Sequence, residues 1–136
     1  MPLKTLSVAL FAGMLLVVGV SAQSPHWPDF NTLQTQIYFG QNSADGDSVS
    51  EEDWATFLQE EVASRFPNGL TVLSAYGQGG GEPPGDAIAD NTNLLIVVHE
   101  NTDEAQEKFS AIEAAYKEQF GQKGVFRVDF PARIAD

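Results

Sequence analysis

The chain has 136 residues, with 7 Lys and Arg against 19 Asp and Glu and a formal net charge of -12. This length suits a single domain. The charge balance excludes most nucleic-acid-binding proteins, because phosphate groups are held mainly by Lys and Arg. It also disfavours adsorption to an anionic membrane surface.

The first 22 residues have the pattern of a secretory signal peptide. Lys4 supplies the positive start, residues 6–20 are uncharged and mostly apolar, and Val20-Ser21-Ala22 resembles a cleavage site. The apolar run is shorter than the roughly 20 residues of a membrane-spanning helix, so a retained anchor is the weaker alternative. We expect cleavage after Ala22 and secretion, to the periplasm or the extracellular space, with no membrane attachment afterwards.

Metal and cofactor sites have little support in the sequence. There is no cysteine, which removes thiol catalysis and thiolate ligands. His99-Glu100 is only half of a zinc-protease motif, and the one other histidine is His26. A partial calcium-loop pattern is more simply a solvated turn before a helix, at Gln41, Ser43, Asp45, Gly46 and Glu52. We therefore expect no metal and no cofactor.

An extended leader is expected to precede the domain. Residues 23–33 contain Pro25 and Pro28 among small or polar neighbours, with Trp27 and Phe30 available to pack on the domain. The domain itself is predicted to span residues 34–131, and residues 132–136 form a C-terminal tail.

Four segments have strand character. Apolar and polar residues alternate in 35–39 and again in 125–130, which is the period of a strand with one buried face. Residues 70–76 and 93–99 are rich in β-compatible side chains. The segment 93–99 is apolar on both sides, which predicts a central strand.

Two segments have helix character. Ser50 is a good N-cap for a helix that ends before Pro67, and its apolar stripe is Trp54, Phe57, Leu58 and Val62. Asn101 or Thr102 caps a second helix that Gly121 ends, with a stripe of Ala105, Phe109, Ile112, Tyr116 and Phe120.

The order strand, helix, strand, strand, helix, strand predicts an α+β fold. Its most economical packing is ferredoxin-like, a four-stranded antiparallel sheet with both helices on one face. The other face is then open to water or to a partner. Residues 77–92 are expected to form a flexible hairpin extension, because this Gly-rich segment lacks the Gly-Lys-Ser/Thr of a phosphate-binding loop.

Several separated motifs resemble those of a known family and occur in the same order. They are Ile37-Tyr38-Phe39-Gly40, Arg65-Phe66-Pro67-Asn68-Gly69-Leu70-Thr71-Val72, Ala75-Tyr76-Gly77-Gln78, Ala115-Tyr116-Lys117 and Val125-Phe126-Arg127-Val128-Asp129. From Gln36 to Pro131 the chain thus resembles a domain family of unknown function found mainly in exported bacterial proteins. The resemblance implies a small exported domain of the ferredoxin-like fold, and it carries no activity.

Strand alternation predicts which residues share the open face. If the helix side holds Ile37, Phe39, Phe126, Val128 and Phe130, the open side holds Gln36, Tyr38, Arg127 and Asp129, with Leu95, Val97 and His99 from the central strand. The candidate ligand-binding or interface residues are Tyr38, Tyr76, His99, Arg127 and Asp129. No residue is assigned a catalytic role.

An apolar centre with a rim of such residues fits several uses. It suits an interface with a second copy, or the floor of a site for a small organic ligand. In a catalytic site, His99 would act as acid or base, Arg127 would bind a carboxylate, and Asp129 would orient either. Arg127 and Asp129 also lie close enough to pair with each other.

The leading hypothesis is an exported, non-catalytic domain that uses the open sheet face for self-association or for binding a small organic ligand. The alternative is a small enzyme, similar to dimeric ferredoxin-like barrel proteins, that acts on a carbonyl or acidic substrate. Neither hypothesis includes a nucleic-acid partner.

Overall fold

The computed structural model describes residues 27, 29–41, 48–77, 90–121 and 124–135. The predictions for the signal peptide and for the Gly-rich segment 78–89 lie outside these residues, as does most of the calcium-loop pattern. Along the chain the elements are β1 (Thr32–Gly40), α1 (Glu51–Phe57), the π-helical turn η1 (Leu58–Ala63), β2 (Thr71–Gly77), β3 (Asp90–Glu100), α2 (Asp103–Phe120) and β4 (Val125–Pro131).

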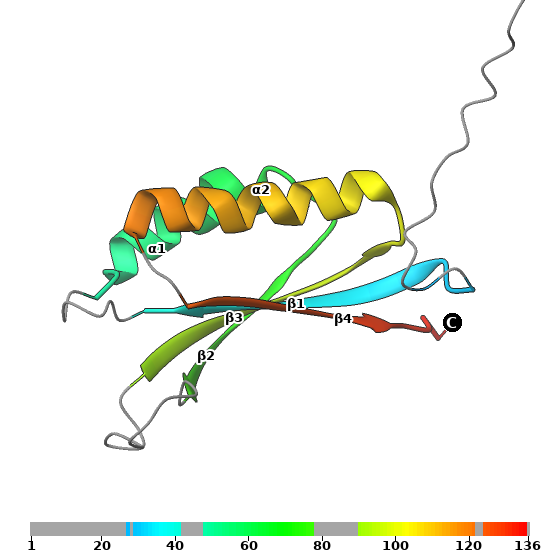
Figure 1. Ribbon diagram of the computed structural model, residues 1–136, viewed down its shortest axis with the longest axis horizontal. Coiled ribbons are helices and arrows are strands. Elements are labelled where there is room, and N and C mark those ends of the chain that lie inside the picture. Colours follow the sequence, from blue (N-terminus) through cyan, green and yellow to red (C-terminus); the bar gives the residue numbers. More distant parts are fainter. Residues whose placement is uncertain (1–26, 28, 42–47, 78–89, 122–123, 136) are drawn as a thin grey trace, which may run out of the picture.

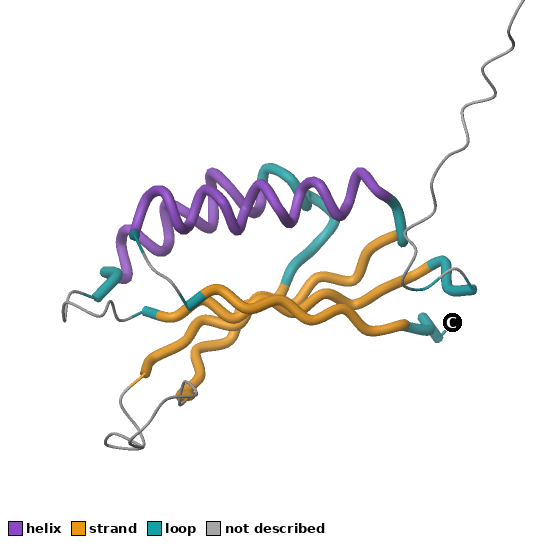
Figure 2. The backbone as a smooth tube through the Cα atoms, in the orientation of Figure 1, coloured by secondary structure: helices purple, strands orange, loops and turns teal. Residues whose placement is uncertain are grey.

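The four strands form one antiparallel sheet in the order β2-β3-β1-β4. Both helices lie on the same side of this sheet, and no described element covers its other side (Figure 1). The tube view shows the two layers separately, with the helices running above the twisted strands (Figure 2). The predicted α+β architecture with two helices on one face is therefore confirmed.

Local signals in the sequence fix the helix ends. The backbone N–H of Asp53 donates to Ser50 Oγ at 3.1 Å, and that of Ala105 donates to Thr102 Oγ1 at 3.2 Å. Gly121 adopts the left-handed conformation with φ of 59° and ends α2. These side chains satisfy backbone groups that a helix terminus leaves free.

The first helix differs from a regular α-helix in its second half. After Phe57 it widens into the π-helical turn η1. Phe57 and Val62 are both buried although they are five residues apart, and a π-helical turn is closed by hydrogen bonds between residues five apart. The wider turn thus keeps both side chains on the core side of the helix.

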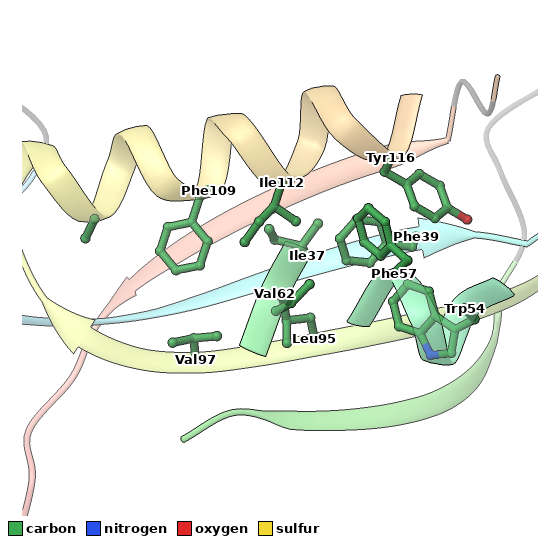
Figure 3. Close-up of a cluster of buried hydrophobic side chains, with 11 residues drawn as sticks. Ile37, Phe39, Trp54, Phe57, Val62, Leu95, Val97, Phe109, Ile112 and Tyr116 are labelled. Atoms are coloured by element: carbon green, nitrogen blue, oxygen red, sulfur yellow. The ribbon is translucent and has the colours of Figure 1, made fainter. Parts of the chain in front are cut away.

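The core fills the space between the helices and the sheet. Phe109, Ile112 and Tyr116 point down from α2 onto β1 and β3 (Figure 3). At one end the aromatic rings cluster around Phe39, whose ring centre lies 4.7 Å from that of Tyr116 and 5.3 Å from that of Trp54. These contacts place α2 along β1, the strand that also contributes to the site below.

Tyr116 is tied to the strand by its hydroxyl group. Its Oη donates to the carbonyl oxygen of Gly40 at 2.6 Å, and the side chain has no exposed surface. Burial raises the pKa of Tyr116 to about 12, so the hydroxyl stays protonated as a donor.

The start of the described chain is held at the corner between β3 and α2. Asn101 Nδ2 donates to the carbonyl oxygens of Trp27 and Phe30, both at 2.9 Å. Within the described ranges, no helix has the length and apolar character needed to cross a membrane.

Candidate functional site

Arg127 and Asp129 lie on the face opposite to the predicted one. In the sheet, Arg127 pairs with Ile37 and Asp129 pairs with Thr35, and both partners are fully buried beneath the helices. The open side of β4 carries Phe126, Val128 and Phe130 instead, and Phe126 is 63% exposed. The prediction that the polar residues of this strand project onto the open face is therefore wrong.

Contacts from α2 explain why the polar side of β4 faces inward. Arg127 Nη1 lies 3.6 Å from a carboxylate oxygen of Glu113, and the guanidinium carbon lies 5.9 Å from the centre of the Phe109 ring. An ion pair and an aromatic face thus accommodate a charge under the helix. Alternation within the strand contains no information about these partners on another element.

The central strand β3 also directs towards the helices the face that was predicted to be open. Leu95, Val97 and His99 were expected on the open side, yet they lie on the helix side with Ile37, Thr35 and Leu33 as their pairing partners. Leu94, Ile96 and Val98 occupy the open side. Because β3 is apolar on both faces, its sequence does not specify which face is inside.

The two candidate tyrosines lie apart from this cluster. Tyr38 is on the open face, as predicted, where its Oη donates to Gln36 Oε1 at 3.0 Å and its ring lies 5.9 Å from that of Phe126. Tyr76 is 78% exposed near the end of β2 and pairs with Asn91. The structure thus brings together only His99, Arg127 and Asp129 of the five candidates.

His99 and Asp129 are joined through the hydroxyl group of Thr35. Thr35 Oγ1 lies 2.7 Å from His99 Nε2 and 2.5 Å from Asp129 Oδ1. The other ring nitrogen, His99 Nδ1, lies 2.7 Å from the carbonyl oxygen of Glu100. We call this His99–Thr35–Asp129 arrangement the polar chain; it crosses the three strands β3, β1 and β4.

The hydrogen bonds of the polar chain require more protons than a neutral His99 supplies. Thr35 has one hydroxyl proton, and a carboxylate and a carbonyl oxygen accept only. If Thr35 donates to Asp129, His99 must donate from Nε2 to Thr35 and from Nδ1 to Glu100. A neutral imidazole has a single N–H, so a neutral His99 beside an ionised Asp129 lacks one proton for these contacts.

Opposing effects set the charge of His99. Burial is the largest and lowers the pKa of His99, because the charged imidazolium loses hydration. The Glu100 carbonyl and the negative charge of Asp129 raise the pKa, and the positive charge of Arg127 lowers it. The net shift is downward from 6.5, which favours the neutral imidazole at neutral pH.

Thr35 is not placed to act as a nucleophile. Its distance to His99 Nε2 is that of a nucleophile and its base. The Thr35 side chain has no exposed surface, however, and no substrate can approach its oxygen. Its role here is to connect His99 with Asp129.

A cleft of about 570 Å³ opens beside His99. Its walls are the end of β3, the first half of α2 and the turn of residues 65–69 that follows η1. Side chains on these walls include Arg65, Phe66, His99, Glu104 and Lys108. Arg127 and Asp129 are not among the lining residues, so only His99 connects the polar chain to the cleft.

Thr35, Phe66 and Glu113 belong to this region and were not expected there. In the sequence, Thr35 is the start of an alternating strand, and Phe66 belongs to a motif shared with the family, and neither pattern indicates a site. Glu113 lies on α2 between the buried residues Phe109 and Tyr116. This position beside the buried face of the helix is the signal that could have indicated a carboxylate reaching towards the sheet. In the parts of the chain that are described, no group of three His, Asp or Glu is arranged to hold a metal ion.

The open face differs from the cleft in chemistry. Across the middle of the sheet, three rows of residues share this face, and we call them the open-face rows: Phe130, Gln34 and Val98; Val128, Gln36, Ile96 and Thr71; Phe126, Tyr38, Leu94 and Leu73. None of these residues is charged. The next row on the same face pairs Thr32 with the charged residue Glu100 at the end of β3. Leu73 and Val98 are each 48% exposed and Phe130 is 42% exposed, so the rows form an exposed apolar surface.

The fold and the two surfaces define a small α+β domain of ferredoxin-like topology. The sequence matches the family described as "Protein of unknown function (DUF3574)" over residues 34–135, and the chain belongs to this family. No match was found among the curated proteins.

Solved structures with a similar fold include a phage SAM lyase. In complex with S-methyl-5'-thioadenosine, that lyase is 16% identical with a TM-score of 0.56, covering 75% of this chain and 82% of its own. The phage SAM lyase in its apo state is also 16% identical, with a TM-score of 0.51 and coverage of 76% and 92%. At this identity the likeness establishes the fold alone.

Proposed function

We propose that this chain is an exported, non-catalytic domain that self-associates through the open-face rows. The observation that carries the proposal is the absence of charge from those rows, in a chain with 19 acidic residues. Charged residues are typically depleted from the centre of an interface, and large exposed apolar patches are rare on monomers. A second copy offers the same neutral, apolar surface.

The size of the surface suits a face-to-face pair. Four strands about 4.8 Å apart and about seven residues long at 3.3 Å each give a flat area of roughly 450 Å² per subunit. Side-chain relief increases the accessible area, so two sheets packed together bury on the order of 1,000 Å² in total. That value is at the lower limit for a specific interface.

Sedimentation velocity of the mature chain tests this proposal. Phe126→Glu places a carboxylate in the surface at a side chain that is already 63% exposed, so the monomer is expected to stay folded. The wild type is expected to sediment as a dimer and Phe126→Glu as a monomer. Ala114→Glu, at an exposed position of α2, is the matched control and is expected to remain dimeric. A monomeric wild type over a wide concentration range would refute the proposal.

Export rests on the sequence of the first 22 residues. Their charge and apolar pattern support a cleaved signal peptide. Expression of the full chain, followed by fractionation and N-terminal sequencing, is expected to recover a protein that begins at Gln23. An uncleaved chain in the cytoplasm would contradict this part of the proposal.

A small enzyme is the second candidate. Two observations favour it, the fold shared with a SAM lyase and the cleft beside His99. The direct test is to incubate the mature chain with S-adenosylmethionine and to follow S-methyl-5'-thioadenosine by chromatography. Turnover that is lost in a folded His99→Ala variant would favour the enzyme over the non-catalytic domain, and no product above the uncatalysed background would reject this activity.

A further inference from the structure

The cleft beside His99 combines three features that together indicate the chemical class of a ligand. It holds a half-buried imidazole, two cationic side chains and an accessible aromatic ring. Its volume of about 570 Å³ lies within the usual range for small-molecule sites. Every residue that lines it belongs to the described part of the chain.

The first feature is the incomplete hydrogen bonding of neutral His99. Its Nδ1 is 2.7 Å from the Glu100 carbonyl, and both residues line the cleft. Thr35 is buried and fixed on the other side of the ring, whereas the Nδ1 side is exposed. A protonated His99 carries an N–H on both ring nitrogens, so Nε2–H can donate to Thr35 while a ligand anion competes with the Glu100 carbonyl for Nδ1–H.

The second feature is positive charge in an acidic protein. Arg65 and Lys108 line the cleft and account for two of the 7 basic residues. Each has a carboxylate partner one helical turn away, Glu61 at 2.7 Å and Glu104 at 2.8 Å. The pair of Lys108 and Glu104 is exposed and thus weak, so an anion in the cleft can compete for Lys108.

The third feature is a flat apolar wall. The half-buried ring of Phe66 stacks on Phe109, with ring centres 4.5 Å apart and planes inclined by 23°. Lys108 Nζ lies 5.9 Å from the centre of the Phe66 ring. Phe66 lines the cleft, so an aromatic ligand ring can contact the part of the Phe66 ring that Phe109 leaves uncovered while its acidic group reaches a cation.

Charged groups face His99 from every neighbouring element. They are Asp129 and Arg127 from β4, Glu113, Glu104 and Lys108 from α2, Glu100 from β3 and Arg65 from the turn after η1. The Asp129 charge favours a protonated ring, the Arg127 charge opposes it, and Glu113 pairs with Arg127. The negative charge of a bound ligand would raise the pKa of His99 and so favour the imidazolium.

We propose that this cleft binds a small aromatic carboxylate, and that binding is accompanied by uptake of one proton at His99. The carboxylate stays ionised, the proton comes from solvent, and no covalent bond of the ligand changes. In the complex, the ligand carboxylate replaces the Glu100 carbonyl as the acceptor for Nδ1–H, Nε2–H donates to Thr35, and Thr35 donates to Asp129. The proposal does not depend on self-association, although Val98 of the open-face rows also lies at the edge of the cleft.

Titration with benzoate tests the proposal on the mature wild-type chain. Proton uptake requires the affinity to rise as the pH is lowered from neutral towards the lowered pKa of free His99, by up to about tenfold for each unit of pH. Imidazole ¹⁵N chemical shifts are expected to give a higher pKa for His99 with benzoate than without it. Benzamide has the same ring without the charge and is expected to bind at least about tenfold more weakly, with no dependence on pH.

The sequence offers a matched control, since His26 is the only other histidine. His99→Gln is expected to abolish the pH dependence of benzoate binding, whereas His26→Gln leaves it unchanged. If His99→Gln does not fold, the ¹⁵N chemical shifts of His99 in the wild-type chain, with and without benzoate, still test the proposal. Unchanged His99 shifts at saturating benzoate, an affinity independent of pH, or equal binding of benzamide would each overturn the proposal.

Discussion

Replacing Thr35 by valine removes one hydroxyl group and keeps the branched shape of the side chain. The hydroxyl is fully buried and touches both His99 Nε2 and Asp129 Oδ1. Valine fits the strand as well as threonine does and is the more apolar residue. On burial alone, Thr35→Val should therefore be neutral or stabilising.

The polar chain predicts the opposite outcome. A buried polar group that loses its partner costs about 1–3 kcal/mol, and Thr35→Val leaves two such groups. Both are only partly buried, so water offsets some of the loss, and we expect a destabilisation of about 2 kcal/mol. For a domain of roughly 100 residues this corresponds to a fall in Tm of about 10 °C.

Chemical denaturation of Thr35→Val and Thr35→Ser measures the effect. Serine keeps the hydroxyl and loses a methyl group, which costs about 1 kcal/mol. In a double-mutant cycle, the cost of Thr35→Val should shrink by about 1 kcal/mol when Asp129→Ala, which removes the acceptor, is already present. A Thr35→Val protein as stable as the wild type, or more stable than Thr35→Ser, would refute the assigned role of the polar chain.

The remaining predictions concern His99, Tyr116 and Gly121. Because the pKa of His99 is lowered in the fold, its contribution to stability is present above about pH 6.5 and is lost as the pH falls through the folded-state pKa. Urea denaturation should show this loss in the wild type and not in His99→Gln; parallel curves for the two would contradict it. Tyr116→Phe removes the 2.6 Å hydrogen bond to the Gly40 carbonyl and should destabilise by about 1–3 kcal/mol, with Tyr38→Phe on the open face as a near-neutral control. Gly121→Ala forces a Cβ into the left-handed conformation and should cost about 1–2 kcal/mol by thermal denaturation, more than Gly124→Ala; equal costs would argue against the cap.

The helix boundaries and the fold class could be predicted because their signals are local. Ser50, Thr102 and Gly121 each act on backbone within a few residues, and all three perform the predicted capping role. The order of helices and strands then leaves few compact arrangements. A ferredoxin-like sheet is the simplest of these.

The faces of β3 and β4 could not be predicted because they depend on distant partners. Shifting the pairing register of a strand by one residue moves every side chain of that strand to the opposite face of the sheet. For β4, the inward orientation of Arg127 is stabilised by Glu113 and Phe109 on α2. A single strand of alternating Val, Phe, Arg and Asp does not contain that information, so the candidate site was placed on the wrong side.

The position of β1 has a consequence for the order in which the sheet can assemble. The first strand lies between β3 and β4, and β4 follows the other three strands along the sequence. While β4 is unpaired, Phe126, Val128 and Phe130 are missing from the open side, and Arg127 and Asp129 are missing from beneath α2. Pairing between strands that are distant in sequence is slow to form, so the open-face rows are completed late in folding. Copies in which β4 is still unpaired thus lack the surface through which folded copies would recognise one another.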